Sequence, residues 1–200
     1  MSVKLVIYPL LSFILLFISA KISYKYRLVD LPNQRKLHAE ATAFTGGVAI
    51  SLILLVSILL FEYSNNVFNT IVSMSFLISL IGFIDDKYNL NVGGKLSLQI
   101  FPIFYLIVFQ NLALNQLGDY GYFELNTGSF SIPFTLICAL FLINAFNYFD
   151  GVDGTVSFAS ISVLFILYFL VPDQEFQFFL IIFVIPIFIF LFFNFSLFKL

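Results

Sequence analysis

The sequence predicts an all-α, polytopic integral membrane helical bundle in a single domain that covers residues 1–200. Apolar residues occupy 61% of the chain, charged residues only 10%, and the mean hydropathy is +1.05. Charged residues make up about 25% of an ordinary soluble domain. A second observation is that the apolar residues gather in seven runs separated by short polar segments. Because backbone polar groups in lipid must be satisfied within the segment, we expect each run to be a helix.

The lengths of the seven runs bear on which of them cross the membrane. They occupy residues 3–20, 47–61, 68–84, 96–114, 132–149, 156–171 and 176–198. About 20 apolar residues, at a rise of about 1.5 Å each, cross the hydrocarbon layer. The second and sixth runs are marginal by this measure, and a re-entrant hairpin is an alternative there. The first run lacks a small-residue cleavage site and precedes basic residues, which predicts a retained anchor.

The charged residues predict how the spans are oriented. If seven helices alternate from an amino terminus on the outside, eight of the nine basic residues fall inside, as the positive-inside rule requires. The acidic residues that share this inner side are Asp30, Glu40, Asp85, Asp86, Asp150 and Asp153. With one span fewer, Asp85 and Asp150 would lie on opposite faces. We therefore expect a multi-pass protein of the cell (inner) membrane whose site faces the cytoplasm.

The composition disfavours several other classes of protein. Cys138 is the only cysteine and lies within an apolar run, so neither a disulfide framework nor a thiolate metal site is expected. The formal net charge is −2, and the basic residues lie beside the spans instead of forming a stripe. No nucleic-acid partner is therefore expected. Membrane lipid is the partner that the composition itself predicts.

Three polar segments on the predicted inner side carry the candidate functional residues. The first runs from Asp30 to His38, and paired glycines, Gly46 and Gly47, follow it at the start of the second run. Glycines at a helix start let a ligand approach N–H groups that favour anions, and Lys36 could meet phosphate oxygens. Taken alone, this segment favours a simpler alternative, in which its cations fix the topology and touch lipid head groups.

The second segment begins with two adjacent aspartates, Asp85 and Asp86, at the end of the third run, and it reaches Lys95 at the start of the fourth. Neighbouring carboxylates repel each other, and at the carboxyl end of a helix they also oppose the helix dipole. A solubilising pair with a purely structural role would have to overcome both effects. The pair therefore indicates a proton acceptor or a metal site.

The third segment is the most specific and reads Asn-Ala-Phe-Asn-Tyr-Phe-Asp-Gly-Val-Asp-Gly over residues 144–154. Asn144 and Asn147 fall on one helical face, and Asp150 continues that face before glycines break the helix. Together with Asp153, these residues offer amide and carboxylate oxygens that suit a hard divalent ion or the hydroxyls of a sugar. A structural polar turn is the alternative.

The three segments, in this order, resemble the motifs of the polyprenyl-phosphate N-acetylhexosamine-1-phosphate transferase family (glycosyltransferase family 4). The stretches that carry the resemblance are DLPNQRKLH with the later TGGVAI, GFIDDKYNL and LINAFNYFDGVDG. The first of them is similar to the undecaprenyl-phosphate GlcNAc-1-phosphate transferase branch. The resemblance extends over essentially the whole chain.

The resemblance implies an enzyme that transfers a sugar-1-phosphate from a UDP-sugar to undecaprenyl phosphate, releases UMP and requires Mg²⁺. Such a reaction would initiate a cell-envelope polysaccharide such as lipopolysaccharide. By resemblance, Asp85 and Asp86 are the catalytic pair and Asn147 contacts the metal. The residues assigned by resemblance to substrate binding are Lys36, Lys95, Asn144, Asp150 and Asp153. A homodimer is left open.

The family has ten or eleven spans, whereas about seven are expected here. Beyond the seventh span it carries a glycine-aspartate motif that supplies another metal ligand, and then a histidine-rich loop. The resemblance therefore implies that these 200 residues are the amino-terminal part of the transferase domain, as a fragment or half of a split product. The alternatives are an inactive fragment, or a non-catalytic paralogue that acts as a membrane scaffold. A transporter is less favoured, because its charges usually lie near the membrane midplane.

Overall fold

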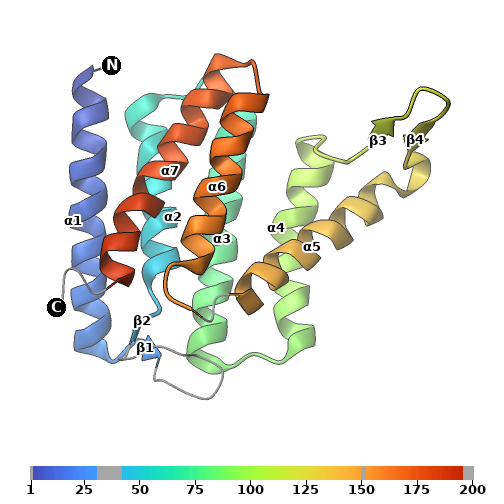
Figure 1. The fold of residues 1–200 in the computed structure, drawn as a ribbon. Helices are drawn as coiled ribbons and strands as arrows, with labels where there is room; N and C mark the ends of the chain where they lie inside the picture. The colour runs from blue at the N-terminus through green and yellow to red at the C-terminus, as the bar shows by residue number, and fades with distance from the viewer. Residues whose placement is uncertain (1, 31–41, 150–151, 196–200) are drawn as a thin grey trace.

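The computed structural model describes residues 2–30, 42–149 and 152–195, and this part of the chain holds seven α-helices (Figure 1). Their bounds are α1 Ser2–Tyr26, α2 Gly46–Phe61, α3 Asn66–Tyr88, α4 Val92–Phe109, α5 Ser131–Phe149, α6 Thr155–Leu170 and α7 Gln174–Asn194. Five are long and apolar enough to cross a membrane, and α2 and α6 are the two shorter apolar helices. The predicted all-α membrane bundle is thus confirmed: the chain is a multi-pass membrane protein.

Local sequence explains where the helices near the polar segments begin and end. Asn65 and Asn91 precede α3 and α4, and each side chain accepts a hydrogen bond from an amide of the first turn, at 2.9 and 2.6 Å. Such capping satisfies N–H groups that have no partner within the helix. Helix α3 ends at Tyr88, and the residue after it, Asn89, has a left-handed backbone conformation. Its last turns therefore carry Asp85 and Asp86, as predicted.

The predicted ends that differ most from the structure are those of the first and fourth helices. The first helix continues beyond the apolar run as far as Tyr26, because a helix can extend into the head-group region, where polar residues are tolerated. The fourth run was expected to be helical to residue 114, but α4 ends at Phe109. Asn111 there has a left-handed conformation, with φ 55°, which interrupts a helix.

Helices α1, α2, α3 and α7 form the densely packed side of the bundle. Its core includes the fully buried side chains of Tyr8, Ile53, Val72 and Ile182. Helix α6 packs on α7, whereas α4 joins the bundle through α3 and α5 packs mainly on α4. Figure 1 shows the α4–α5 pair standing to one side of the other five helices, with α5 strongly tilted. The two sides of the bundle thus differ in packing.

Two short antiparallel hairpins accompany the helices, and the sequence analysis anticipated neither. Strand β1 (Val29–Asp30) pairs with β2 (Thr42–Ala43) next to the start of α2. Strand β3 (Gln116–Asp119) pairs with β4 (Glu124–Asn126) between α4 and α5, and a 3₁₀ turn at Gly128–Phe130 leads into α5. Both hairpins lie outside the apolar runs.

The order of the helices brings the polar segments to one end of the bundle. Figure 1 shows α1, α3 and α5 ending, and α2, α4 and α6 beginning, at the end that also carries β1 and β2. The β3–β4 hairpin lies at the opposite end. The described helices therefore alternate in direction, as expected from the sequence.

Candidate functional site

A cavity of about 960 Å³ opens among α2, α3, α4, α5, α6 and α7 at the end of the bundle that carries the polar segments. Five of the polar residues singled out from the sequence line it: Asp85, Asp86, Lys95, Asn144 and Asn147. They come from the end of α3, the start of α4 and the end of α5. The structure thus brings the second and third polar segments to one place.

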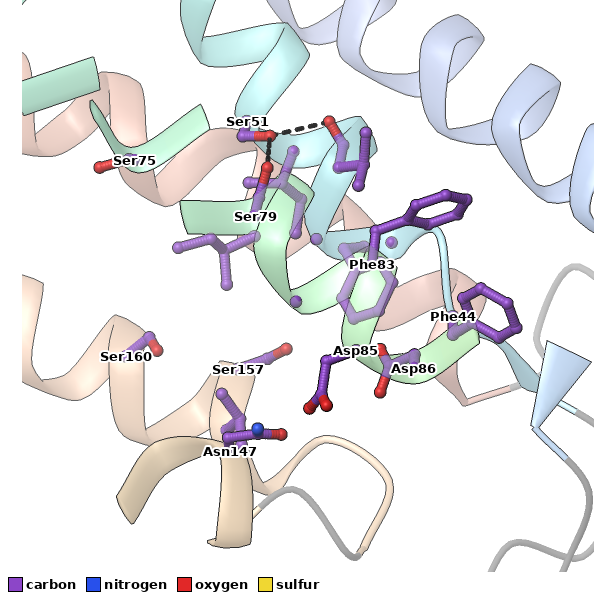
Figure 2. Close-up of a pocket in the computed structure, with 18 of the residues that line it drawn as sticks. Phe44, Ser51, Ser75, Ser79, Phe83, Asp85, Asp86, Asn147, Ser157 and Ser160 are labelled. Carbon is purple, nitrogen blue, oxygen red and sulfur yellow. Dashed lines mark hydrogen bonds between the residues drawn. The ribbon is translucent and has the colours of Figure 1, made fainter. Parts of the chain in front are cut away.

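The Asp85 carboxylate is held by an ion pair. Lys95 Nζ donates to Asp85 Oδ2 at 2.6 Å, and the two side chains are only 13% and 19% exposed. In Figure 2 the carboxylate of Asp85 points toward Asn147 and Ser157 across the cavity, with Asp86 beside it. Lys95 therefore supplies a cation that offsets both the adjacent carboxylate and the negative end of α3.

Asn144 is fixed by a contact between α4 and α5. Its amide nitrogen donates to Gln99 Oε1 at 2.9 Å and to the Leu140 carbonyl at 2.8 Å. Gln99 is only 2% exposed, so this amide pair lies inside the bundle. One turn further on, Asn147 is exposed to the cavity. With its nitrogen engaged, the Asn144 side chain has its carbonyl oxygen left to accept from a ligand.

The amino-terminal ends of three helices contribute to the cavity wall. Gly46, Gly47 and Val48 of α2 line it, as do Val92, Lys95 and Leu96 of α4, and Gly154, Val156 and Ser157 around the start of α6. Helix amino termini carry partial positive charge and unpaired N–H groups, which together favour bound anions. The cavity therefore combines carboxylates from helix ends with three anion-favouring helix starts.

The two glycines at the start of α2 play different parts. A side chain at Gly46 would collide with the ring of Phe190 on α7, so this glycine permits close packing of two helices. A Cβ at Gly47 would meet nothing within 4 Å, and Gly47 lines the cavity. Both glycines line the cavity, and Gly46 in addition permits the close approach of α7.

The other three predicted site residues are Lys36, Asp150 and Asp153. Lys36 and Asp150 lie outside the described residues, so their predicted roles stay predictions. Asp153 lies half-buried in the turn before α6 and is not among the described residues that line the cavity, although its neighbour Gly154 is.

Gln99 and Asn194 have no predicted role from the sequence, whereas the structure gives each of them one. Asn194 lines the cavity near the end of α7, and its Oδ1 accepts a hydrogen bond from the Gly154 amide at 2.5 Å. It thereby ties the turn before α6 to α7. Gln99 and Asn194 are isolated amides in otherwise apolar runs, and polar residues within spans commonly carry a function. That signal points to both residues but not to their partners.

The donor atoms in the cavity fit a magnesium ion. Among the described residues there is no cluster of three or more His, Cys, Asp or Glu side chains. Asp85 and Asp86 nevertheless provide carboxylates and Asn147 an amide oxygen on the same cavity. Mg²⁺ prefers oxygen donors and is commonly bound by one or two carboxylates, with water and substrate phosphates completing its coordination.

The fold and the cavity together define a polytopic membrane protein with an acidic, amide-containing site at the ends of its spans. Comparison with known families identifies it further. The model of glycosyl transferase family 4 matches residues 68–199, and the chain belongs to this family. The match includes every residue of the cavity that comes from α3 to α7.

Individual relatives agree with the family. The chain is 29% identical over 171 residues to an undecaprenyl-phosphate alpha-N-acetylglucosaminyl 1-phosphate transferase of Yersinia pestis, covering 82% of this chain and 47% of that protein. It is 31% identical over 170 residues to the protein of the same name in Escherichia coli O157:H7, covering 82% and 46%. A probable undecaprenyl-phosphate N-acetylglucosaminyl 1-phosphate transferase of Bacillus subtilis is 28% identical over 143 residues, covering 70% and 40%. The chain thus spans about half the length of the curated relatives it matches.

Proposed function

We propose that the chain forms part of a phosphoglycosyltransferase that transfers an N-acetylhexosamine 1-phosphate from a UDP-sugar to undecaprenyl phosphate. UMP leaves, and the product initiates a cell-envelope polysaccharide. The observation that carries the proposal is the convergence of Asp85, Asp86, Lys95, Asn144 and Asn147 on one cavity in a member of this family. The activity for which these relatives are named supports the undecaprenyl acceptor.

The carboxylate pair receives the acceptor phosphate in this proposal. An oxygen of that phosphate attacks the β-phosphorus of the UDP-sugar, a new P–O bond forms, and the bond to UMP breaks. Asp85 and Asp86 orient the acceptor and take up its proton where it carries one. Lys95, already paired with Asp85 at 2.6 Å, lies where it can also contact a phosphate oxygen.

The donor sugar nucleotide lies against α5 and the turn before α6. Asn144, Asp150 and Asp153 shape its pocket, with Lys36 as a further phosphate contact. The three helix amino termini around the cavity stabilise the diphosphate, because its negative charge faces their N–H groups. Mg²⁺, held by Asp85, Asp86 and Asn147, would neutralise charge on the departing phosphate when bound.

The chemistry is tested by following the transfer of radiolabelled sugar phosphate from UDP-N-acetylglucosamine to undecaprenyl phosphate. The assay is run in membranes that contain the chain and, in parallel, any longer product of the same gene. We expect labelled lipid to form in a magnesium-dependent manner. If neither protein forms labelled lipid, the enzymatic proposal is wrong and a scaffold role takes its place.

We further propose that the protein lies in the inner membrane with its cavity facing the cytoplasm. The bias of the basic residues supports this orientation. Since Cys138 is the only cysteine, single-cysteine variants at Lys87 and Asp119, made in a Cys138→Ser background, can report sidedness. An impermeant thiol reagent added to intact cells should label position 119 and spare position 87. Labelling of both positions from outside would contradict the orientation.

A further inference from the structure

The β3–β4 hairpin has two chemically different faces. Asp119 lies opposite Glu124, and beyond an irregularity of the register between Gln116 and Gly118, Gln116 lies opposite Asn126. Residues directly opposite in an antiparallel pair point to the same side, and alternate residues of one strand do so as well. These four polar side chains therefore share one face, which we call the acidic face of the hairpin.

The other face of the hairpin is apolar and aromatic. Leu125 lies between Glu124 and Asn126, so its side chain points away from the acidic face, and its partner across the hairpin is Gly118. The ring of Tyr120 occupies the space beside Gly118, with ring atoms 3.1 Å from where a Cβ would be. Phe123 stacks on Tyr120 with ring centroids 5.3 Å apart. Tyr120, Phe123 and Leu125 thus form the aromatic face.

The described protein leaves this aromatic face uncovered. Phe123 and Leu125 are 61% and 45% exposed, and the strands make no extensive contact with any helix. An isolated two-stranded hairpin is only marginally stable in water. A segment of this kind with a stacked aromatic pair therefore needs something to cover that pair.

The position of the hairpin indicates that lipid provides the cover. It connects two helices long and apolar enough to cross a membrane, α4 and α5. In Figure 1 it projects sideways from the bundle and reaches no further along the bundle axis than the turn between α6 and α7. A sideways segment at the end of a span lies at the depth of the head groups, where tyrosine and other amphipathic rings gather.

The charges define which face turns toward water. Asp119 and Glu124 are like charges placed directly opposite each other, so they repel. Their repulsion is weak in water, where the dielectric constant is high, and strong in lipid, where it is low. No lysine or arginine occurs between residues 96 and 198 to compensate them. Attraction to anionic lipids therefore plays no part, and the interaction depends on the aromatic face.

We propose that the β3–β4 hairpin is an interfacial anchor, with its aromatic face embedded among lipid head groups and its acidic face in water. The anchor holds the end of α5 that is remote from the cavity. Interfacial aromatic residues help to set the tilt of a spanning helix. The same helix carries Asn144 and Asn147 at its other end, so the anchor and the cavity share one rigid element.

The chain contains no tryptophan, which gives a direct test. Leu125→Trp and Glu124→Trp place a single tryptophan on the aromatic face and on the acidic face, at neighbouring positions. Each full chain is reconstituted into phosphatidylcholine vesicles and titrated with acrylamide in water, or prepared with brominated phosphatidylcholine. Phe123→Trp is a conservative third variant, in case the first pair folds poorly.

We expect brominated lipid to quench the emission of the Leu125→Trp variant several-fold more than that of the Glu124→Trp variant. Acrylamide should show the reverse order, at low and at high salt. Equal acrylamide quenching of both variants would show a hairpin in water and overturn the proposal. Shielding of position 125 from both quenchers would show that protein, such as a second copy, covers the face, and would also overturn it. Neither result depends on transferase activity.

Discussion

The two sides of the bundle hold the residues of the site in different ways. On the side of α1, α2, α3 and α7, fully buried residues such as Ile53 and Ile182 interlock, and stacked rings such as Phe68 and Phe179 add to the packing. On the side of α4 and α5, Thr135 is the one buried residue among the described residues of α5, whereas α4 buries Gln99, Pro102, Ile103 and Ile107. Helix α5 is therefore only loosely enclosed by the described part of the chain.

The cavity lies where these two sides meet, and polar contacts join them. Asp85 belongs to the packed side, and Lys95 reaches it from α4. Gln99 on α4 in turn holds Asn144 on α5. The carboxylates thus stand on a helix that is held by packing, with Lys95 paired to Asp85, whereas Asn144 stands on a helix that a polar contact from Gln99 links to α4. Substitutions on the two sides should therefore fail in different ways.

The largest effect is expected from the carboxylate on the packed side. Asp85→Asn removes the charge paired with Lys95 and should lower transferase turnover roughly 100-fold, or about 2.7 kcal/mol of transition-state stabilisation. Asp119→Asn, at the opposite end of the protein, is the matched control and should retain wild-type turnover. Initial rates of lipid labelling provide the measurement. Unchanged turnover of Asp85→Asn would remove this residue from the active centre.

The next effect concerns stability and separates the two sides directly. Ile53→Ala opens a cavity in the packed side and should lower the free energy of unfolding by about 2 kcal/mol, near the low end for buried large-to-small changes. Ile137→Ala on α5, where the side chain is 66% exposed, should change it by no more than about 0.5 kcal/mol.

Unfolding in mixed detergent micelles, followed by circular dichroism, measures both variants. Equal losses at the two positions would mean that α5 is buried against protein, and the contrast between the two sides would no longer hold.

A smaller effect is expected from the polar link on the sparsely packed side. Gln99→Leu removes the acceptor for the Asn144 amide and should lower turnover about tenfold, since a buried donor then loses its partner. If Gln99 acts by positioning Asn144, the same change in an Asn144→Ala background should cost almost nothing. Additive losses in this double-mutant cycle would show that Gln99 acts by some other route.

The smallest effect tests a polar contact inside the packed side. Ser51 Oγ and Ser79 Oγ lie 2.6 Å apart between α2 and α3, as the dashed line in Figure 2 shows. A double-mutant cycle with Ser51→Ala and Ser79→Ala should give a coupling energy of about 0.6 kcal/mol, the usual size for hydrogen bonds between membrane helices. A coupling well above this size in the free energy of unfolding would reverse the contrast, because polar contacts would then also hold the packed side.

The sequence predicted several features of the site through local rules. Asp85 and Asp86 had to end a helix because an apolar run stops there, and Asn144 and Asn147 had to share a helical face because they are three residues apart. It did not predict the partners of these residues. No role was predicted for Gln99 and Asn194, because their contacts join residues that are 45 and 40 positions apart in the sequence.

By itself, the sequence determined that the chain lies in lipid, where its seven helices fall, and which end of the bundle gathers the polar segments. Those features depend on composition, on the length of apolar runs and on the parity of the spans. Only the tertiary structure decided which helices pack tightly, how α4 and α5 stand apart, and how Lys95 and Gln99 link the two sides. The physical reason is that residues facing lipid and residues facing another helix are equally apolar, so the pattern of hydrophobicity does not distinguish one face of a span from another.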